Sequence, residues 1–146
     1  MLAICAIVPS CDRPTFKDIK LTEDQLEILS LTKQLLDSIT HADWPVYVDL
    51  CADDLSAFEP EAHEHLVEGL EFHKHYFDMS EQSPYVGVTT TISSPVIRIH
   101  GETAFIAYNR LTQRIVDGKS ETTSTQETRI WFRENDKWQH VHFHRS

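Results

Sequence analysis

The chain has 146 residues, of which 40% are hydrophobic and 25% are charged, and its formal net charge is −10. This length is enough for one domain with a substantial core and too short for two. Nucleic acids and anionic membrane surfaces attract basic protein surfaces, so the acidic composition predicts that the chain binds neither. A local basic site remains compatible with the acidic total.

The cysteines and the first residues indicate the cellular compartment of the protein. Cys5, Cys11 and Cys51 are an odd number without a disulfide-framework spacing, which predicts reduced thiols in a cytoplasmic protein. The apolar start MLAICAIVPSC lacks the Lys or Arg of a signal peptide, and its apolar run of about seven residues is short for one. We interpret residues 1–20 as a leader or linker and residues 21–146 as the domain.

The first part of the domain predicts helices. Thr22 and Gln25 form a T-x-x-Q capping box, followed by an apolar stripe at helical spacing over about 18 residues. A second, shorter helix is expected after Asp43, with Pro45 in its first turn. A third helix is expected over about residues 61–78, because its apolar positions fall on one helical face. Those positions are Leu66, Leu70, His73 and Phe77.

From about residue 85 the apolar period changes from 3.6 to 2, which predicts four or five long strands. The strand-like segments are 85–93, 95–101, 103–113, 124–133 and 137–145. Turn signals separate them at Ser94–Pro95, Gly101–Glu102, Asp117–Gly118 and Asn135–Asp136. The connections are too short for crossover helices, so the sheet is expected to be antiparallel. The fold class predicted is α+β, with helices packed on one face of a curled sheet.

Charged side chains interrupt the apolar faces of these strands and of the third helix. A guanidinium stays charged in any protein environment, so on a buried face it requires an acceptor or an anion. Curling of the sheet would bring five such polar residues to one cavity: His73, Tyr108, Arg110, Arg129 and Arg145. Two interpretations stay open, a pocket for a small carboxylate or internal pairing of the arginines with Glu59, Glu61 and Glu127.

Histidines alternate along the last predicted strand, which raises the question of a metal site. His140, His142 and His144 are expected on one face, opposite Val141, Phe143 and Arg145. Three imidazoles in a row along a strand spread over about 13 Å at 3.3 Å per residue, too far for one zinc ion. We therefore predict a polar or interface face and no metal.

The sequence offers little for catalysis. It contains no G-x-S-x-G, no H-E-x-x-H and no glycine-rich phosphate loop. Asp53–Asp54 and the pair Glu59 and Glu61 are interpreted as caps and surface charge. We predict no catalytic residues and no cofactor.

Large apolar side chains occur on both faces of the predicted strands, and one layer of helices covers only one face. The aromatic residues concerned are Tyr85, Phe105, Trp131, Phe132 and Trp138. A second copy of the chain is the simplest cover for the other face.

Several strings, in order and at matching spacing, resemble the association, or hub, domain of calcium/calmodulin-dependent protein kinase II. They are AFEPEA (57–62), LVEGLEFHKHYF (66–77), IAYNRLTQ (106–113) and QETRIWFRENDKWQHVHFHRS (126–146), and the resemblance covers about residues 22–146. It implies an NTF2-like cone, with N-terminal helices packed on a strongly curved antiparallel sheet. It also implies rings of dimers, usually with twelve or fourteen copies, that gather kinase domains. In that family the cavity holds arginines, and the matching positions are Arg110, Arg129, Arg145 and, on the third helix, His73.

The sequence also departs from a whole kinase. The kinase signatures V-A-I-K, H-R-D and D-F-G are absent, no basic amphipathic helix precedes Thr22, and a tryptophan expected after His73 is missing. We therefore predict a self-assembling scaffold, excised from a kinase or stand-alone, that is not itself an enzyme. The alternatives are an NTF2-like isomerase or cyclase and a dimeric binding module of the nuclear-transport type.

Overall fold

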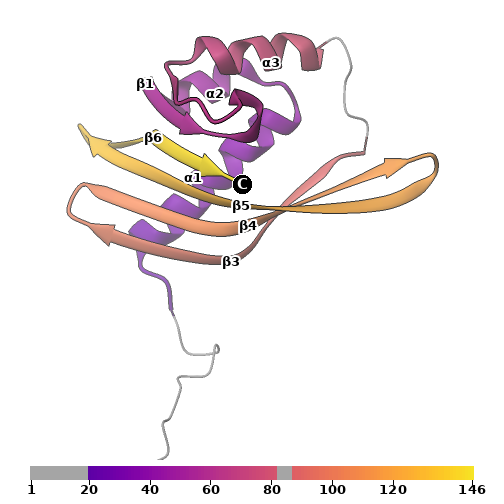
Figure 1. Cartoon of the computed structure of the whole chain (residues 1–146). Helices are drawn as coiled ribbons and strands as arrows, with labels where there is room; N and C mark the ends of the chain where they lie inside the picture. The colour runs from indigo at the N-terminus through magenta and orange to yellow at the C-terminus, as the bar shows by residue number, and fades with distance from the viewer. Residues whose placement is uncertain (1–19, 82–86) are drawn as a thin grey trace, which may run out of the picture.

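Figure 1 shows the helices gathered on one side of a curved sheet in a computed structural model that describes residues 20–81 and 87–146. The helices are α1 (Glu23–Thr40), α2 (Trp44–Leu50) and α3 (Glu71–Glu81), and a 3-10 turn, η1, spans Pro60–Ala62. The strands are β1 (Cys51–Phe58), β2 (Val67–Glu68), β3 (Thr89–His100), β4 (Thr103–Val116), β5 (Lys119–Glu134) and β6 (Lys137–Arg145). They form one sheet in the order β2-β1-β6-β5-β4-β3. The predicted α+β class is confirmed. Residues 1–19 of the predicted leader, with Cys5 and Cys11, and Tyr85 lie outside the described residues.

Helix α1 begins and ends as the sequence predicts. The Thr22 hydroxyl accepts a hydrogen bond from the Gln25 backbone N–H, and Gln25 Oε1 accepts one from the Thr22 N–H at 2.9 Å. The Gln25 side chain also donates to the Ile97 carbonyl at 3.0 Å, which ties the start of α1 to β3. Ile28 and Leu35 are fully buried, so the apolar face of α1 packs on the sheet.

The predicted third helix is wrong in its first half. Helix α3 begins at Glu71, and residues 61–70 form η1, a loop and the short strand β2. Gly69 has a φ of 76°, which an α-helix does not accommodate, and its N–H donates to the Leu55 carbonyl of β1. Leu66 is consequently 48% exposed, whereas His73 and Phe77 occupy the buried face as predicted.

Strand β1 is an addition to the predicted sheet. It pairs antiparallel with β2 and parallel with β6. The sheet was predicted to be antiparallel, and this one parallel pair is the difference. The parallel pair joins β1 and β6, which are far apart in the sequence. Glu59 and Glu61, which line the cavity described below, follow directly after β1.

Strands β3 to β6 form the antiparallel part, and three of the four predicted turns connect them. The exception is Ser94–Pro95, which lies inside β3. Ser94 has a φ of 51°, and the register shifts between Ser93 and Val96, so this turn signal marks a β-bulge. Segments 85–93 and 95–101 were predicted as separate strands, but Thr89–His100 is one strand.

A second irregularity changes the face of one histidine. Ile130 of β5 pairs with His142, and Trp131 pairs with His140, which leaves Val141 as an extra residue in β6. His140 therefore points to the inner face, where its ring stacks on Phe143 at 5.6 Å. The prediction that all three histidines share the outer face is wrong for His140, which is fully buried.

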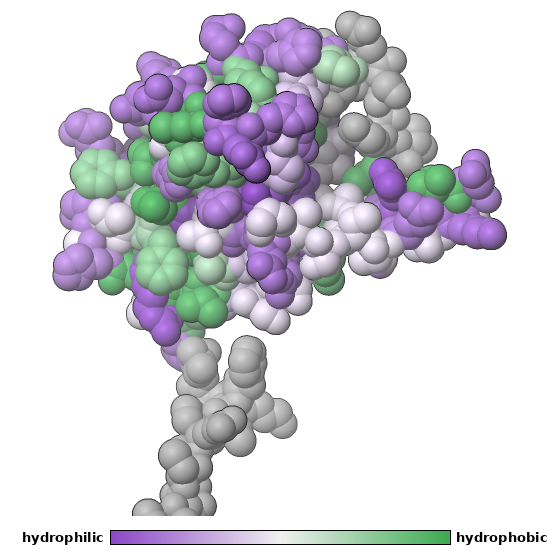
Figure 2. All heavy atoms as spheres, in the orientation of Figure 1, coloured by the Kyte–Doolittle hydropathy of each residue, from purple (hydrophilic) through white to green (hydrophobic). Residues whose placement is uncertain are grey.

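The helices cover the inner face of the sheet and leave the outer face exposed to solvent. Trp131 and Trp138, expected on uncovered faces, are buried in the core at 0% and 2% exposure. Four large apolar side chains are 40–46% exposed: Phe58, Val96, Phe105 and Phe132. Figure 2 shows hydrophobic residues gathered over the sheet away from the projecting β4–β5 hairpin. We call these four residues the outer apolar face.

Candidate functional site

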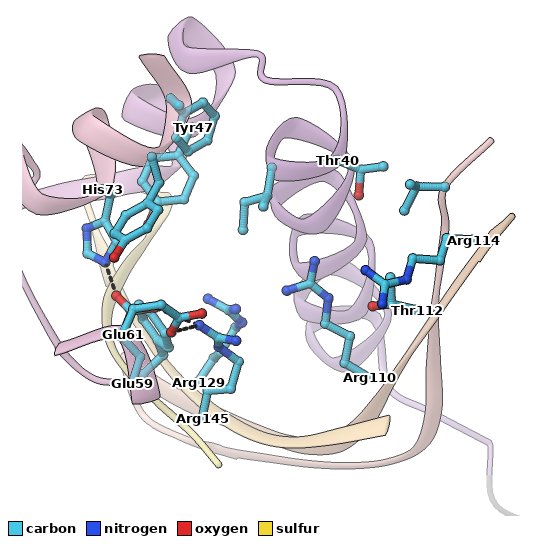
Figure 3. A pocket seen from close by; sticks show the side chains of 15 residues that line it. Thr40, Tyr47, Glu59, Glu61, His73, Arg110, Thr112, Arg114, Arg129 and Arg145 are labelled. Carbon is cyan, nitrogen blue, oxygen red and sulfur yellow. Dashed lines mark hydrogen bonds and ion pairs between the residues drawn. The ribbon is translucent and has the colours of Figure 1, made fainter. Parts of the chain in front are cut away.

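A cavity of about 340 Å³ lies between the inner face of the sheet and the helices (Figure 3). Helices α1, α2 and α3 supply its apolar wall with Ile39, Tyr47 and Phe77. The sheet and the segment after β1 supply its charged groups: Glu59, Glu61, Arg110, Arg114, Arg129 and Arg145. This lining combines an apolar body with convergent ionic groups, as ligand sites commonly do.

Arg129 is the most buried of these charges. It is 2% exposed, and its NH2 donates to Glu127 Oε2 at 2.7 Å. Its Nε donates to the Tyr108 hydroxyl at 2.8 Å, and Tyr108 in turn donates to Glu127 at 2.5 Å. The guanidinium also lies 4.6 Å from the centre of the Phe143 ring. Arg129 is thus fixed by internal partners on every side.

The electrostatics of this cluster keep Glu127 ionised and the Tyr108 hydroxyl protonated. Burial raises the pKa of the Glu127 carboxyl, but the charges of Arg129 and then Arg110 outweigh it and bring the pKa to about 2. Burial raises the pKa of the Tyr108 hydroxyl to about 12, and the neighbouring Glu127 contributes to that rise. Glu127 is therefore an ionised and very weak base.

A second ion cluster closes one end of the cavity. Arg145 of β6 donates to Glu59 Oε2 at 3.0 Å and also to Glu61. His73 Nε2 lies 3.1 Å from the other oxygen of Glu59. Burial raises the pKa of Glu59, but the hydrogen bond and charge of His73, followed by those of Arg145, lower it overall. In Figure 3 this cluster faces Arg110 and Arg114 across the cavity.

Arg110 is less completely paired than Arg129 and Arg145. Its NH1 is 3.4 Å from Glu127 Oε1, a long contact to a carboxylate that already has closer donors. Among the residues that the structure describes, its buried Nε has no hydrogen-bond partner, and neither has Nδ1 of His73. Buried donors without partners are costly, which makes them candidates for contact with a ligand.

Cys51 and His140 lie behind the cavity wall. His140 Nε2 is 3.3 Å from NH1 of Arg129, and its Nδ1 is 3.6 Å from the Cys51 sulfur. Burial lowers the pKa of His140, and the charge of Arg129 lowers it further, so the ring is neutral. Burial raises the pKa of the Cys51 thiol to about 12, which leaves it protonated and unreactive. This pair is structural and is not a nucleophile with its base.

The family model of the calcium/calmodulin-dependent protein kinase II association domain matches residues 24–146. The chain belongs to this family. It is 45% identical over 122 residues to the alpha chain of the type II kinase from Drosophila melanogaster, an overlap of 82% of this chain and 23% of that relative. For the rabbit (Oryctolagus cuniculus) delta subunit the corresponding shares are 90% and 25%, at 41% identity. The chain thus spans about a quarter of the length of these curated relatives.

Solved hub domains agree with this assignment. The association domain of the C. elegans kinase has a TM-score of 0.79 and 38% identity, covering 84% of this chain and 95% of that one. The hub homology domain from Chlamydomonas reinhardtii also has a TM-score of 0.79, with 40% identity and coverage of 85% and 98%. An NTF2-like protein from Pseudomonas putida, 16% identical, has a TM-score of 0.67 over 84% of this chain and 85% of that one, which confirms the NTF2-like fold. The family model and the solved hub domains match this chain as an association domain, and no kinase domain is indicated.

Most of the expected site residues of this hub domain meet at the cavity. His73, Arg110, Arg129 and Arg145 line it, whereas Tyr108 lies behind the wall and holds Arg129 and Glu127. The carboxylates named as alternative partners, Glu59, Glu61 and Glu127, do pair with the arginines. Sequence reasoning missed Arg114, although its position four residues after Arg110 on the same strand was a sufficient signal.

The chemistry of the hub cavity differs from that of a proton-transferring isomerase. A general base needs a pKa near the working pH, and the carboxylates Glu59 and Glu127 have lowered pKa values. Asp53 and Asp54 are exposed on β1.

Within the described residues, no group of three or more His, Cys, Asp or Glu side chains is arranged to hold a metal ion. None of the helices described has the length and apolar character of a transmembrane span.

Proposed function

We propose that this hub domain assembles with copies of itself into closed, stacked rings of dimers with twelve or more subunits. The outer apolar face carries the proposal, because the chain's own helices lie on the other side of the sheet. Removing a large apolar side chain from water contributes about 1.5–3 kcal/mol, so four such residues favour association. Membership of the association-domain family supports the same conclusion.

A closed ring of dimers requires two kinds of contact. Pairing of two outer apolar faces is isologous and gives a dimer, and a lateral heterologous contact that repeats around an axis closes the ring. Attached domains would gain effective concentration from such an assembly. If the chain is joined to a kinase, as the names of its longer relatives indicate, neighbouring catalytic domains would meet readily.

Particle mass tests the assembly. Light scattering on a sizing column and native mass spectrometry should give twelve or more subunits for the wild type. Phe105→Glu and Phe132→Glu place a charge on the outer apolar face and should yield smaller species, because a buried unpaired charge is costly. Gln34→Glu adds the same charge on the exposed side of α1 and should leave the mass unchanged. A wild-type monomer or dimer at all protein concentrations contradicts the proposal.

We also propose that the cavity binds a small carboxylate. Arg129 and Arg145 are neutralised internally. Arg110 has a long contact, and its Nε has no partner in the described part of the chain, so it is the group that an anion would complete. An arginine–carboxylate hydrogen bond is stronger than a neutral one and contributes about 1.5–3 kcal/mol.

Calorimetric titration with butyrate tests the carboxylate site. The wild type should bind, and Arg110→Gln should weaken binding about tenfold or more, which corresponds to the loss of one charge-assisted hydrogen bond. Arg133→Gln serves as the matched control, because Arg133 pairs with Glu102 and Asp24 away from the cavity. Absence of binding to the wild type, or equal binding to Arg110→Gln, refutes this site.

A further inference from the structure

Two arginines on β4 share one wall of the cavity. Arg110 and Arg114 are four residues apart on one strand, so their side chains project from the same face, with Thr112 between them. Figure 3 shows the Arg114 side chain reaching towards Arg110 from that wall, with the Glu59–Arg145 cluster on the other side. The Arg110 side chain is 16% exposed and that of Arg114 is 49% exposed. Arg110 therefore lies deeper and Arg114 nearer the mouth.

These two arginines differ from the other two in how their charges are met. Arg129 and Arg145 contact carboxylates at 2.7 and 3.0 Å. Within residues 20–81 and 87–146, the ion pair of Arg110 is the 3.4 Å contact with Glu127. Arg114 has a 3.5 Å contact with Glu121, which is itself 49% exposed. An exposed pair of this kind contributes at most about 1 kcal/mol, so Arg114 can exchange Glu121 for a ligand at little cost.

We propose that Arg110 and Arg114 together bind a doubly charged acid group, that of a small phosphate monoester, whose apolar body rests on Ile39 and Phe77. This inference rests on the proposed acid-binding function of the cavity and specifies its ligand class. A monocarboxylate completes one guanidinium, whereas a phosphate has enough oxygens and charge for two. The volume of about 340 Å³ suits a small molecule.

The orientation of the ligand follows from the distribution of charge. At the opposite end Glu59 and Glu61 already neutralise Arg145, and Glu59 also contacts His73. A second anion there would meet two carboxylates. The phosphate therefore lies at the β4 wall, and the apolar body extends along the helices.

A matched pair of probes tests the charge requirement. Phenyl phosphate is largely a dianion at pH 7.5, because its second pKa is about 6, as for a phosphorylated side chain. Phenyl sulfate has the same shape and a single charge. In calorimetric titrations of the full chain, the wild type should bind phenyl phosphate about tenfold more tightly than phenyl sulfate. Arg114→Gln should abolish that preference while retaining the affinity for phenyl sulfate, which shows that the cavity is intact.

Two further variants separate a direct contact from a general change of charge. Lys119→Gln removes one positive charge from the start of β5 in the same hairpin, at a residue that does not line the cavity, and should keep the tenfold preference. Glu121→Gln removes the competing carboxylate of Arg114 and should tighten phenyl phosphate binding several-fold.

The outcomes distinguish this inference from the proposal on which it rests. Equal affinity for the two probes, or a preference that persists in Arg114→Gln, overturns the dianion site and leaves the acid-binding cavity in place. Failure of the wild type to bind phenyl phosphate, phenyl sulfate and butyrate refutes both. A preference lost equally in Lys119→Gln also overturns the site, because it assigns the effect to overall charge.

Discussion

Glu127 shows how this fold holds an ionised carboxylate at 2% exposure. The hydroxyl of Tyr108 and two nitrogens of Arg129 donate to it at 3.2 Å or less, and Arg110 adds a longer contact. Such a pair contributes little net stability compared with apolar packing, yet removing one partner leaves the other charge buried and uncompensated. The cavity wall therefore depends on Glu127 more than on any exposed ion pair.

Replacing Glu127 with glutamine tests this dependence. At pH 7.5 the variant should lose about 3–5 kcal/mol of unfolding free energy, because Arg129 keeps its charge without a counter-ion. The exposed control Glu121→Gln should lose about 1 kcal/mol or less. Urea denaturation at a fixed protein concentration measures both, and similar losses in the two variants would contradict the buried-pair account.

The same variant carries a pH signature. The folded pKa of Glu127, about 2, lies below its ordinary value of 4.5, so the unfolded chain takes up the proton first as the pH falls. The stabilisation is thus complete above pH 4.5 and is lost between pH 4.5 and 2. Glu127→Gln should lack this part of the acid destabilisation. If the unfolding free energies of wild type and variant run parallel between pH 4.5 and 2, Glu127 is not its source.

Among the elements, those set by local signals were predictable and those set by distant pairing were not. The capping box of Thr22 fixed the start of α1, and asparagine, aspartate and glycine marked the hairpin turns. Strand β1 contains Asp53 and Asp54, which have low β propensity, and its position depends on pairing with β6 near the other end of the chain. The start of α3 was misplaced because helical spacing was given more weight than the glycine at position 69.

The candidate site was predictable where strand alternation holds. Arg110 and Arg129 were placed inward because each shares a strand face with large apolar or aromatic residues, and the structure puts both at the cavity. His140 was misplaced because the bulge at Val141 shifts the alternation by one residue, and a single sequence does not mark such bulges. Arg114 was missed because the predicted strand ended at residue 113, whereas β4 continues to Val116.

For the molecule as a whole, assembly brings many acidic chains together. Each chain has a formal net charge of −10, so subunits repel one another while the outer apolar faces attract. The repulsion is long-ranged and screened by salt, with a Debye length of about 30 Å at 0.01 M and about 8 Å at 0.15 M ionic strength. Apolar contact is short-ranged and far less sensitive to such concentrations.

The proposed ring should therefore lose subunits when salt is lowered. Mass photometry or native mass spectrometry at 10 mM and 150 mM salt should show a shift to smaller species at the lower concentration, since unscreened repulsion acts between every pair of neighbours. Replacing both Glu27 and Glu68, which are exposed, with glutamine removes two negative charges, which changes the net charge from −10 to −8, and should reduce the shift. Identical mass distributions at the two salt concentrations would show that charge repulsion does not oppose assembly. A shift that is equally large in the double variant would assign the salt effect to specific ion pairs at the contacts instead of to net charge.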